Sequence, residues 1–408
     1  MDNVSFFDGA NRFVVDRPIR LIELFAGIGS QAKALERIIR GGQFEHYRIC
    51  EFDKYAVASY NAVHGTNFTT SDITKITADD LGIVDTDKYC YIMTYSFPCQ
   101  DLSLAGKKRG MGKGTGTRSG LLWEVERLLD ECKELPQVLI MENVPQVIGT
   151  KNIEHFAKWQ EKLESLGYKN KWQVLNAKDF GVPQNRERCF MVSVLGDYYY
   201  EFPKKIKLEK RLKDVLETEV AEKYYLSDRA IQGIMNTNFD CNKLEHRTQK
   251  NGIMPTICAR DYKDPKLVIE LNELTSGQSQ ANRIYDPNGL SVTLSANGGG
   301  LGAKTGLYLV DNEPVALDEQ NNYIRKDGCI GTLTTDGSSP KHNNRLIENC
   351  RVRKLTPKEC WRLMGFDDAD VDRAKSIGLS DAQLYKQAGN SIVVNVLEAI
   401  MKNLLKNA

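Results

Sequence analysis

The sequence lacks the features that would indicate a membrane protein, a secreted protein or a zinc-binding domain. Its 408 residues contain no apolar run near the roughly 20 residues that a transmembrane helix needs. The N-terminus has neither the basic start nor the apolar stretch of a secretory signal. The ten cysteines form no C-x-x-C pair and the five histidines are scattered, so no metal-ligand spacing is present. We therefore expect a cytoplasmic protein that binds no membrane and no metal.

The chain also has almost no net charge, and the formal value of +1 does not indicate a nucleic-acid-binding protein. The local distribution is more informative, because residues 102–118 contain five basic side chains and no acidic one. A second basic run begins at Lys204. Each run is either a solvated surface or a contact for phosphate groups. The five side chains of the first run are Lys107, Lys108, Arg109, Lys113 and Arg118.

Residues 19–195 alternate between short apolar runs and longer amphipathic segments, which predicts an α/β fold with a doubly wound, mainly parallel sheet. We expect strands at 20–24, 47–51, 91–95, 138–141, 172–175 and 189–195. We expect helices at 31–39, 54–63, 120–132 and 153–166.

After about residue 200, glycine, asparagine and threonine become frequent and the expected strands are short. The pattern Gly-x-x-x-Thr-(Ile/Leu) occurs at 252–257, 289–294 and 328–333, followed by apolar triplets at 267–269, 307–309 and 345–347. This predicts a smaller β-rich domain of three hairpin-like units, with coincidence between similar turns as the alternative. Helical signals return at 356–364, where Thr356 can cap, and an apolar stripe runs from 393 to 405.

Three positions at expected strand ends indicate a nucleoside pocket. The strand at 20–24 runs into Phe25-Ala-Gly27-Ile-Gly29, a glycine turn that opens a helix and lets the backbone approach a ligand. Glu51 ends the next strand, where its carboxylate can accept hydrogen bonds from ribose hydroxyls. Asp72 stands where a third strand would end, and it could accept from an adenine amino group. Taken alone, each carboxylate is better explained as a capping or surface residue, and only their place at successive strand ends indicates a pocket.

Two further strand ends carry reactive groups. Cys99 follows Pro98 after the strand at 91–95, beside the basic loop, whose cations should favour the thiolate. Glu142 follows the strand at 138–141 and would face the same crevice, where a carboxyl group can donate to or accept from a ring nitrogen. Arg186 and Arg188 precede the strand at 189–195 and lie near that edge. The alternatives are a buried structural cysteine and a salt-bridged surface turn.

These blocks together resemble the DNA (cytosine-5)-methyltransferase family of bacterial and phage restriction–modification systems. The blocks are ELFAGIGS, SDI, SFPCQ, TRSGLLW, MENV, QNRER, RKLTPKECWRLMGF and QAGNSIVVNVL, in this order from Glu23 to Leu397. Two positions depart from the usual pattern. Ser119 follows Arg118 where glycine is frequent, and a serine precedes Asp72 where glycine is common.

The resemblance implies that Cys99 adds to cytosine C6, which activates C5 toward the methyl group of S-adenosyl-L-methionine (AdoMet). It also implies that Glu142 engages N3 and the amino group, and that Arg188, with Arg186 alongside, is directed at O2. No base for the C5 proton stands out, and water is a candidate. The target cytosine must leave the duplex to reach such a pocket.

The resemblance assigns further residues to cofactor and DNA. Phe25 would pack on adenine beside Gly27 and Gly29, with Glu51 and Asp72 as ribose and adenine contacts. The basic residues of the loop at 101–117, with Arg118, would meet phosphates. Thr293 and Thr332 are alternative members of a Thr-Leu pair in the recognition region. The methionine side of the cofactor would contact Pro98, Leu121, Asn390 and Ser391.

The implied organisation is an AdoMet-binding catalytic domain at 18–200 with an inserted target-recognition domain at 205–350. A C-terminal segment, 351–408, would return to complete the catalytic domain. The expected partner is double-stranded DNA, and a cognate restriction endonuclease could act on the same site. We expect a monomer.

Three other functions are compatible with parts of the sequence. A nicotinamide-dependent oxidoreductase explains the glycine turn but leaves FPCQ, ENV and QNRER without roles. A tRNA cytosine-5 methyltransferase would keep every catalytic residue, but it would not need a groove-reading domain of this size. A DNA-binding relative without activity is disfavoured because Cys99, Glu142 and Arg188 are all present.

Overall fold

The computed structural model describes most of the chain outside the expected recognition region. The described residues are 11–39, 44–99, 102, 110–114, 116–225, 284–285, 291, 294, 307–310, 315–318, 323–325, 345–347 and 351–405. Contacts divide the chain into two compact units. The first comprises Met1–Val182, Arg186–Leu208 and Met364–Ala408, and the second comprises Pro183–Asn185 and Glu209–Leu363.

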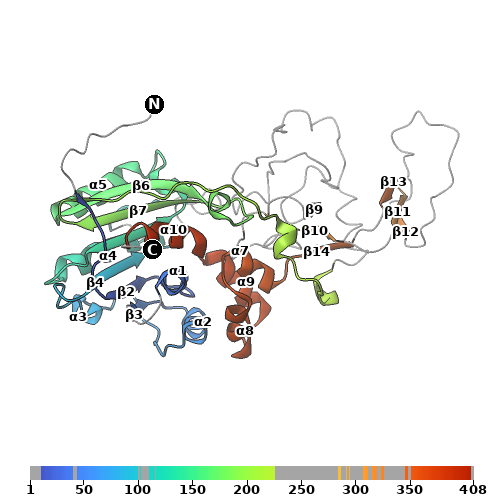
Figure 1. The fold of residues 1–408 in the computed structure, drawn as a ribbon, viewed down its shortest axis with the longest axis horizontal. Helices are drawn as coiled ribbons and strands as arrows, with labels where there is room; N and C mark the ends of the chain where they lie inside the picture. The colour runs from blue at the N-terminus through green and yellow to red at the C-terminus, as the bar shows by residue number, and fades with distance from the viewer. Residues whose placement is uncertain are drawn as a thin grey trace. The chain divides into compact units, whose positions relative to one another are not determined.

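The first unit is built on a six-stranded sheet in the order β3-β2-β4-β5-β7-β6 (Figure 1). Neighbouring strands from β3 to β5 are parallel, and β7 is antiparallel to both β5 and β6. The apolar runs of β2 and β4 are buried on both faces, as expected for central parallel strands. The strands are β2 Ile19–Leu24, β3 Phe44–Cys50, β4 Cys90–Tyr95, β5 Val138–Asn143, β6 Tyr168–Asn176 and β7 Glu187–Leu195.

All six predicted strands and the mainly parallel sheet are confirmed. The largest difference in bounds is in β6, which begins at Tyr168 and not at the predicted residue 172. Its first half pairs with β7, but four of its residues, Lys169, Lys171, Trp172 and Gln173, are exposed and give no apolar alternation. A two-residue strand β1, Asn11–Arg12, pairs separately with β8, Tyr198–Tyr199.

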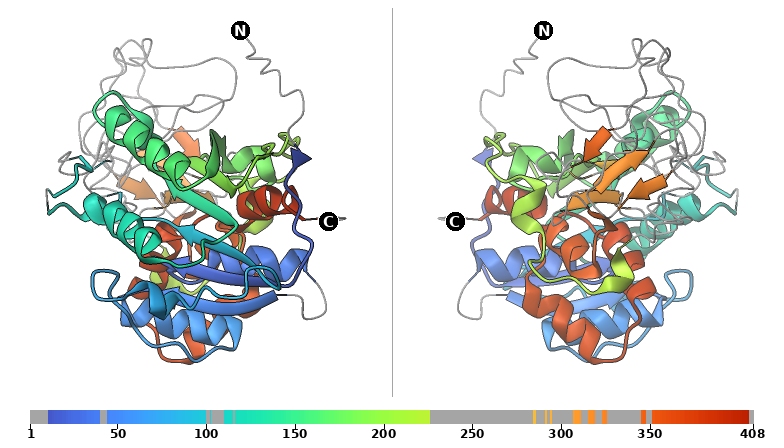
Figure 2. Two further views of the ribbon diagram at one scale, coloured as in Figure 1. Left: turned by 90° about the vertical axis from the view of Figure 1, so that its left-hand side faces the viewer. Right: turned by 90° about the vertical axis from the view of Figure 1, so that its right-hand side faces the viewer.

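Helices cover both faces of this sheet. Apolar residues of α4 and α5 form one core with β2, β4 and β5, and α10 packs against α1; Figure 2 shows these two pairs on opposite sides. The predicted helix at 120–132 is a 3₁₀ turn, Arg118–Leu121, followed by α4. The helices of this unit are α1 Ser30–Ile38, α2 Lys54–His64, α3 Ala78–Leu81, α4 Leu122–Glu131, α5 Ile153–Ser165, α8 Asp368–Ser376, α9 Asp381–Asn390 and α10 Val394–Lys402.

The described part of the second unit contains short strands in two three-stranded sheets, β14-β10-β9 and β12-β11-β13. The predicted apolar triplets at 307–309 and 345–347 lie in β10 and β13, which belong to different sheets, and the triplet at 267–269 lies outside the described residues. The strands are β9 Ile284–Tyr285, β10 Leu307–Val310, β11 Val315–Asp318, β12 Tyr323–Arg325, β13 Arg345–Ile347 and β14 Arg351–Lys354.

Helix α7, Pro357–Leu363, starts as its sequence predicts. The Glu359 amide donates to the Thr356 hydroxyl, and the Thr356 amide donates to the Glu359 carboxylate, which is a capping box. Within the described parts of the chain, no helix has both the length and the apolar character needed to span a bilayer.

Candidate active site

The glycine turn after β2 adopts a backbone that favours glycine at two positions. Gly27 and Gly29 have φ of 58° and 80°, and Phe25 between strand and turn has φ of 59°. A non-glycine residue with positive φ is uncommon, and such strain clusters at ligand sites. The amides of Phe25 and Ala26 donate to the Cys50 carbonyl, which fixes the turn to the end of β3.

Glu51 lies directly after β3 and is held against this turn. One carboxylate oxygen accepts the Gly27 amide at 3.0 Å, and the other accepts the Asp53 amide at 2.9 Å. Burial raises the pKa of Glu51, against the lowering effect of these backbone donors. Each oxygen keeps a lone pair for a further donor such as a ribose hydroxyl.

Phe52, beside Glu51, was missed by the sequence reasoning. Its ring is 78% exposed, the highest value among the large apolar side chains of the described residues. The sequence signal was weak, because an aromatic residue before a helix is usually a packing residue. An exposed ring beside the Glu51 carboxylate is a flat apolar surface on which a base could lie.

The expectation that Asp72 ends a third strand is wrong. Residues 67–72 are irregular, and Asp72 begins a turn in which its carboxylate accepts the Thr74 amide at 3.0 Å. The chain still returns to the end of β3, because the Ser71 amide donates to the Glu51 carbonyl at 2.9 Å. A loop therefore brings Asp72 beside Glu51 without a strand.

The structure brings together the side chains of Cys99, Glu142 and Arg188 on the side of β4 that faces β5 and β7. Arg188 Nε lies 3.0 Å from Glu142 Oε1, and the charges of both act on the Cys99 thiol. The reversed direction of β7 explains this contact, since the start of β7 meets the carboxyl end of β5 and Asn143 pairs with Cys189. Burial raises the pKa of Glu142 despite the nearby positive charges of Arg188 and Arg186.

The expectation that the basic loop favours the Cys99 thiolate stays a prediction, whereas the described surroundings of Cys99 together oppose the thiolate. Burial raises the pKa of the Cys99 thiol, and Arg188 and Arg186 offset this only in part, while Glu142 adds to it. Among the described residues, the cations that lower the pKa of Cys99 are thus Arg186 and Arg188, near the start of β7. The basic loop residues Lys107, Lys108 and Arg109 lie outside the described residues.

Hydrogen bonds fix the segment that carries Cys99. Asn143 Nδ2 donates to the Phe97 carbonyl at 2.9 Å, and the buried Ser119 hydroxyl donates to the Pro98 carbonyl at 2.6 Å. Ser119 is one of the departures from the family pattern, and it therefore adds a bond to this segment. Leu121, two residues later, packs half-buried against the core.

Arg186 is buried, and its guanidinium holds the C-terminal block in place. Its Nη2 donates to the carbonyls of Gly389 and Ser391, at 3.0 Å and 2.8 Å. Burial, together with the Arg188 charge, lowers the pKa of Arg186 to about 9. Asn390 is exposed at the end of α9, and Ser391 is buried. Arg118 is exposed, and Thr293 and Thr332 lie outside the described residues.

This fold, a six-stranded mixed sheet with helices on both faces, is similar to that of solved methyltransferases. The Entamoeba histolytica methyltransferase EhMeth has this fold, with a TM-score of 0.63, 16% identity, and coverage of 95% of this chain and 98% of that one. The S. pombe Dnmt2 methyltransferase gives a TM-score of 0.59, 19% identity, and coverage of 94% and 97%. At these identities the likeness shows the fold alone.

Sequence comparison identifies the family. Residues 19–406 match the family described as C-5 cytosine-specific DNA methylase. The orphan methyltransferase M.SssI of Spiroplasma monobiae is 31% identical over 442 residues, covering 95% of this chain and 97% of the relative. The type II methyltransferase M.HhaI of Haemophilus parahaemolyticus is 31% identical over 389 residues, covering 95% and 94%. The chain belongs to the C-5 cytosine-specific DNA methylase family, and it methylates carbon 5 of cytosine in DNA.

Proposed function

We propose that this enzyme methylates cytosine within a specific short sequence of double-stranded DNA through a covalent bond between Cys99 and cytosine C6. The observation that carries the proposal is the ion pair of Glu142 with Arg188 at 3.0 Å, with both charges acting on the Cys99 thiol. A nucleophile, a carboxyl group and a guanidinium beside one another match the edge of a cytosine ring, which offers N3, an amino group and O2.

The proposed reaction starts when the Cys99 thiol loses its proton to water and the thiolate sulfur bonds to C6, while the electrons of the C5–C6 double bond move toward C5. Glu142 donates a proton or hydrogen bond to N3, and Arg188 donates to O2, so the ring charge is stabilised. AdoMet, the family's methyl donor, would supply the electrophilic methyl group for C5 and leave as S-adenosylhomocysteine. Loss of the C5 proton to water then restores the double bond and expels the Cys99 thiolate.

Arg186 has a different role in this proposal. It is a positioning residue, because both of its described hydrogen bonds from Nη2 go to backbone carbonyls around Asn390. It ties the end of α9 to the turn that presents Arg188, and its charge adds to the positive potential at Cys99.

The residues around the glycine turn fit AdoMet. A Cβ on Gly27 would meet no atom within 4 Å, so the turn leaves open space where a ligand can approach the backbone. Glu51 would hold the ribose hydroxyls, and the rings of Phe25 and Phe52 would flank the adenine. Asp72 would accept from the adenine amino group, and Pro98, Leu121, Asn390 and Ser391 would line the methionine side.

The proposed reaction also assigns the regions that would contact DNA. Residues 205–350 would form the target-recognition domain, and the loop at 101–117 would close over a flipped-out cytosine while Arg118 and its neighbours meet phosphates. Thr293 or Thr332 would supply the Thr-Leu pair. We propose a cytoplasmic monomer that protects DNA in restriction–modification or in a phage, with or without a cognate endonuclease.

A duplex that carries 5-fluorocytosine at the target position tests the covalent step. Fluorine at C5 cannot leave as the proton does, so the adduct accumulates and survives denaturing electrophoresis. We expect the adduct with the unaltered enzyme and with Cys132→Ser, which changes another free, half-buried cysteine. Cys99→Ser should give none. An adduct with Cys99→Ser would refute the assignment of the nucleophile.

A further inference from the structure

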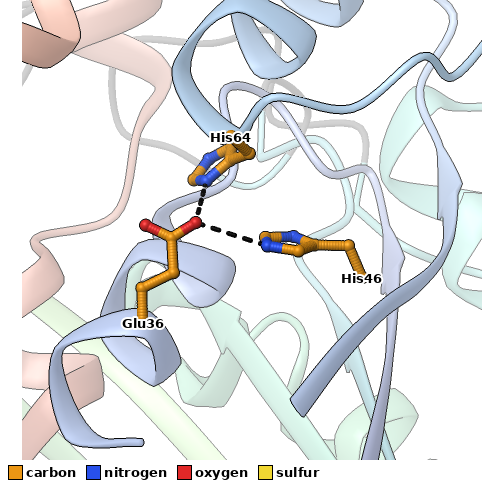
Figure 3. Close-up of side chains that lie close together, drawn as sticks. All are labelled: Glu36, His46 and His64. Carbon is orange, nitrogen blue, oxygen red and sulfur yellow. Dashed lines mark hydrogen bonds and ion pairs between the residues drawn. The ribbon is translucent and has the colours of Figure 1, made fainter. Parts of the chain in front are cut away.

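Three side chains outside the proposed active site converge from three different elements. Glu36 lies on α1, His46 on β3 and His64 at the end of α2 (Figure 3). His64 Nδ1 lies 2.6 Å from Glu36 Oε1, and His46 Nε2 lies 3.3 Å from the same oxygen. The three atoms lie within 4.8 Å of one another.

The second nitrogen of each ring has a partner that determines where the ring carries its proton. His64 Nε2 lies 3.1 Å from the Ile28 carbonyl, which can only accept, so this nitrogen carries a proton. His46 Nδ1 lies 3.1 Å from the Tyr60 hydroxyl, which donates its own hydrogen to Glu23. His46 Nδ1 therefore also donates.

Each ring consequently directs its other nitrogen toward the Glu36 carboxylate, at 2.6 Å for His64 and 3.3 Å for His46. Either ring protons or one metal ion can supply the positive charge that holds these three atoms together. Lys33 is the nearest ammonium, 3.9 Å from Glu36 Oε2, but it lies closer to Asp367 and Asp370, at 3.2 Å and 2.9 Å. Histidines that bind a metal through one nitrogen and donate from the other to a carbonyl or another acceptor show this same arrangement.

We propose that Glu36, His46 and His64 bind one divalent transition-metal ion of the zinc class, with water as a fourth ligand. Two imidazoles and one carboxylate form a known ligand set for Zn²⁺, with bonds of about 2.0–2.2 Å. Such bonds place neighbouring ligand atoms about 3.3 Å apart. The Glu36 oxygen must therefore move away from His64, and its exposed fraction of 29% leaves it room to do so, whereas His64 is 0% exposed.

The site departs from the expectation, drawn from sequence spacing, that the chain binds no metal. The spacing gave no signal because the three ligands are 10 and 18 residues apart on elements that only the fold brings together.

The ion would also stabilise the glycine turn at 25–29, which is assigned to the cofactor. His64 Nε2 contacts the Ile28 carbonyl inside that turn, and a Cβ on Gly29 would lie 2.3 Å from the same nitrogen. Fixing His64 through the metal fixes the backbone of Ile28 and Gly29. Metal and AdoMet should therefore strengthen each other's binding. This coupling rests on the proposed cofactor site, whereas the metal site itself does not.

Cobalt binding to the full-length, chelator-treated enzyme tests the site. We expect one Co²⁺ per chain with the visible absorption of a tetrahedral ion and without a thiolate charge-transfer band, and Zn²⁺ should displace it. Glu36→Gln and His46→Ala should weaken binding at least about 100-fold, because each removes a ligand. His155→Ala, a histidine change on α5, should leave binding unchanged.

Three results would overturn the site: no stoichiometric binding to the unaltered enzyme, a thiolate band, or equal affinity in Glu36→Gln. Circular dichroism of each variant separates lost binding from lost folding, and the stoichiometry of the unaltered enzyme depends on no variant. Calorimetry of AdoMet binding with and without Zn²⁺ tests the coupling. We expect tighter AdoMet binding with Zn²⁺ in the unaltered enzyme alone, and an unchanged affinity would overturn the coupling.

Discussion

The substitution Glu142→Gln separates two effects that the Glu142 carboxylate exerts. Glutamine has nearly the same shape, and its carbonyl can still accept from Arg188 Nε at the position now 3.0 Å away. The change removes the negative charge and the exchangeable proton. The fold around β5 should be retained, because Arg188 keeps a hydrogen-bond acceptor.

The two effects predict opposite changes in rate. The Glu142 charge raises the pKa of Cys99, so its removal makes the thiolate easier to form and would by itself speed up attack on C6. Loss of the proton donor to N3 lowers the rate by about 10²–10⁴, or about 3–5 kcal/mol in activation free energy. We expect the second effect to dominate, because the thiolate is useful only when the ring can accept its electrons.

Single-turnover transfer of a radiolabelled methyl group into a duplex is the assay, with the dissociation constant for DNA measured in parallel. The expected result is near-normal DNA binding with a rate reduced about 100-fold or more. Glu154→Gln, a change in the exposed first turn of α5, is the control and should have no effect. A rate that is unchanged or higher in Glu142→Gln would refute the role in protonating the ring.

Three further predictions follow from the structure and the charge pattern. Below the pKa of Cys99, which burial raises, kcat/KM should increase about tenfold per pH unit as the thiolate forms; a flat profile from pH 6 to pH 8 would contradict this. DNA affinity should fall steeply with salt, with a slope in log–log form of about −0.9 per phosphate contact; a slope near zero would exclude phosphates as the main source of affinity. Gly29→Ala should lower the free energy of unfolding by about 1–3 kcal/mol more than Gly27→Ala, because only the first would clash with His64; equal denaturation midpoints would show that the turn relaxes freely.

The sheet was predictable because its central strands are continuous apolar runs bounded by turn residues. Edge strand β6 was predicted only in its second half, since its exposed residues pair through the backbone and leave no pattern in the side chains. Asp72 was placed in the right region for the wrong reason. The sequence motif shows where Asp72 lies along the chain. Only the hydrogen bond from the Ser71 amide to the Glu51 carbonyl shows that the loop returns to Glu51.

The candidate site was predictable in its residues but not in its electrostatics. Sequence order gives Cys99, Glu142 and Arg188, and the reversed direction of β7 brings them together. The pKa of Cys99 could not be predicted, because it depends on how burial competes with two arginines and one carboxylate. The cluster of Glu36, His46 and His64 left no signal, since contacts between α1, β3 and α2 have no fixed spacing in sequence.

The central claim is that this enzyme methylates C5 of cytosine within one short DNA sequence. The most direct test incubates the purified enzyme with AdoMet and an unmethylated bacterial genome, and then maps 5-methylcytosine at base resolution. The account predicts one short motif methylated throughout the genome by the unaltered enzyme and no methylation by Cys99→Ser. Absence of 5-methylcytosine from the DNA, with a folded protein that binds AdoMet and methylates tRNA, would contradict it.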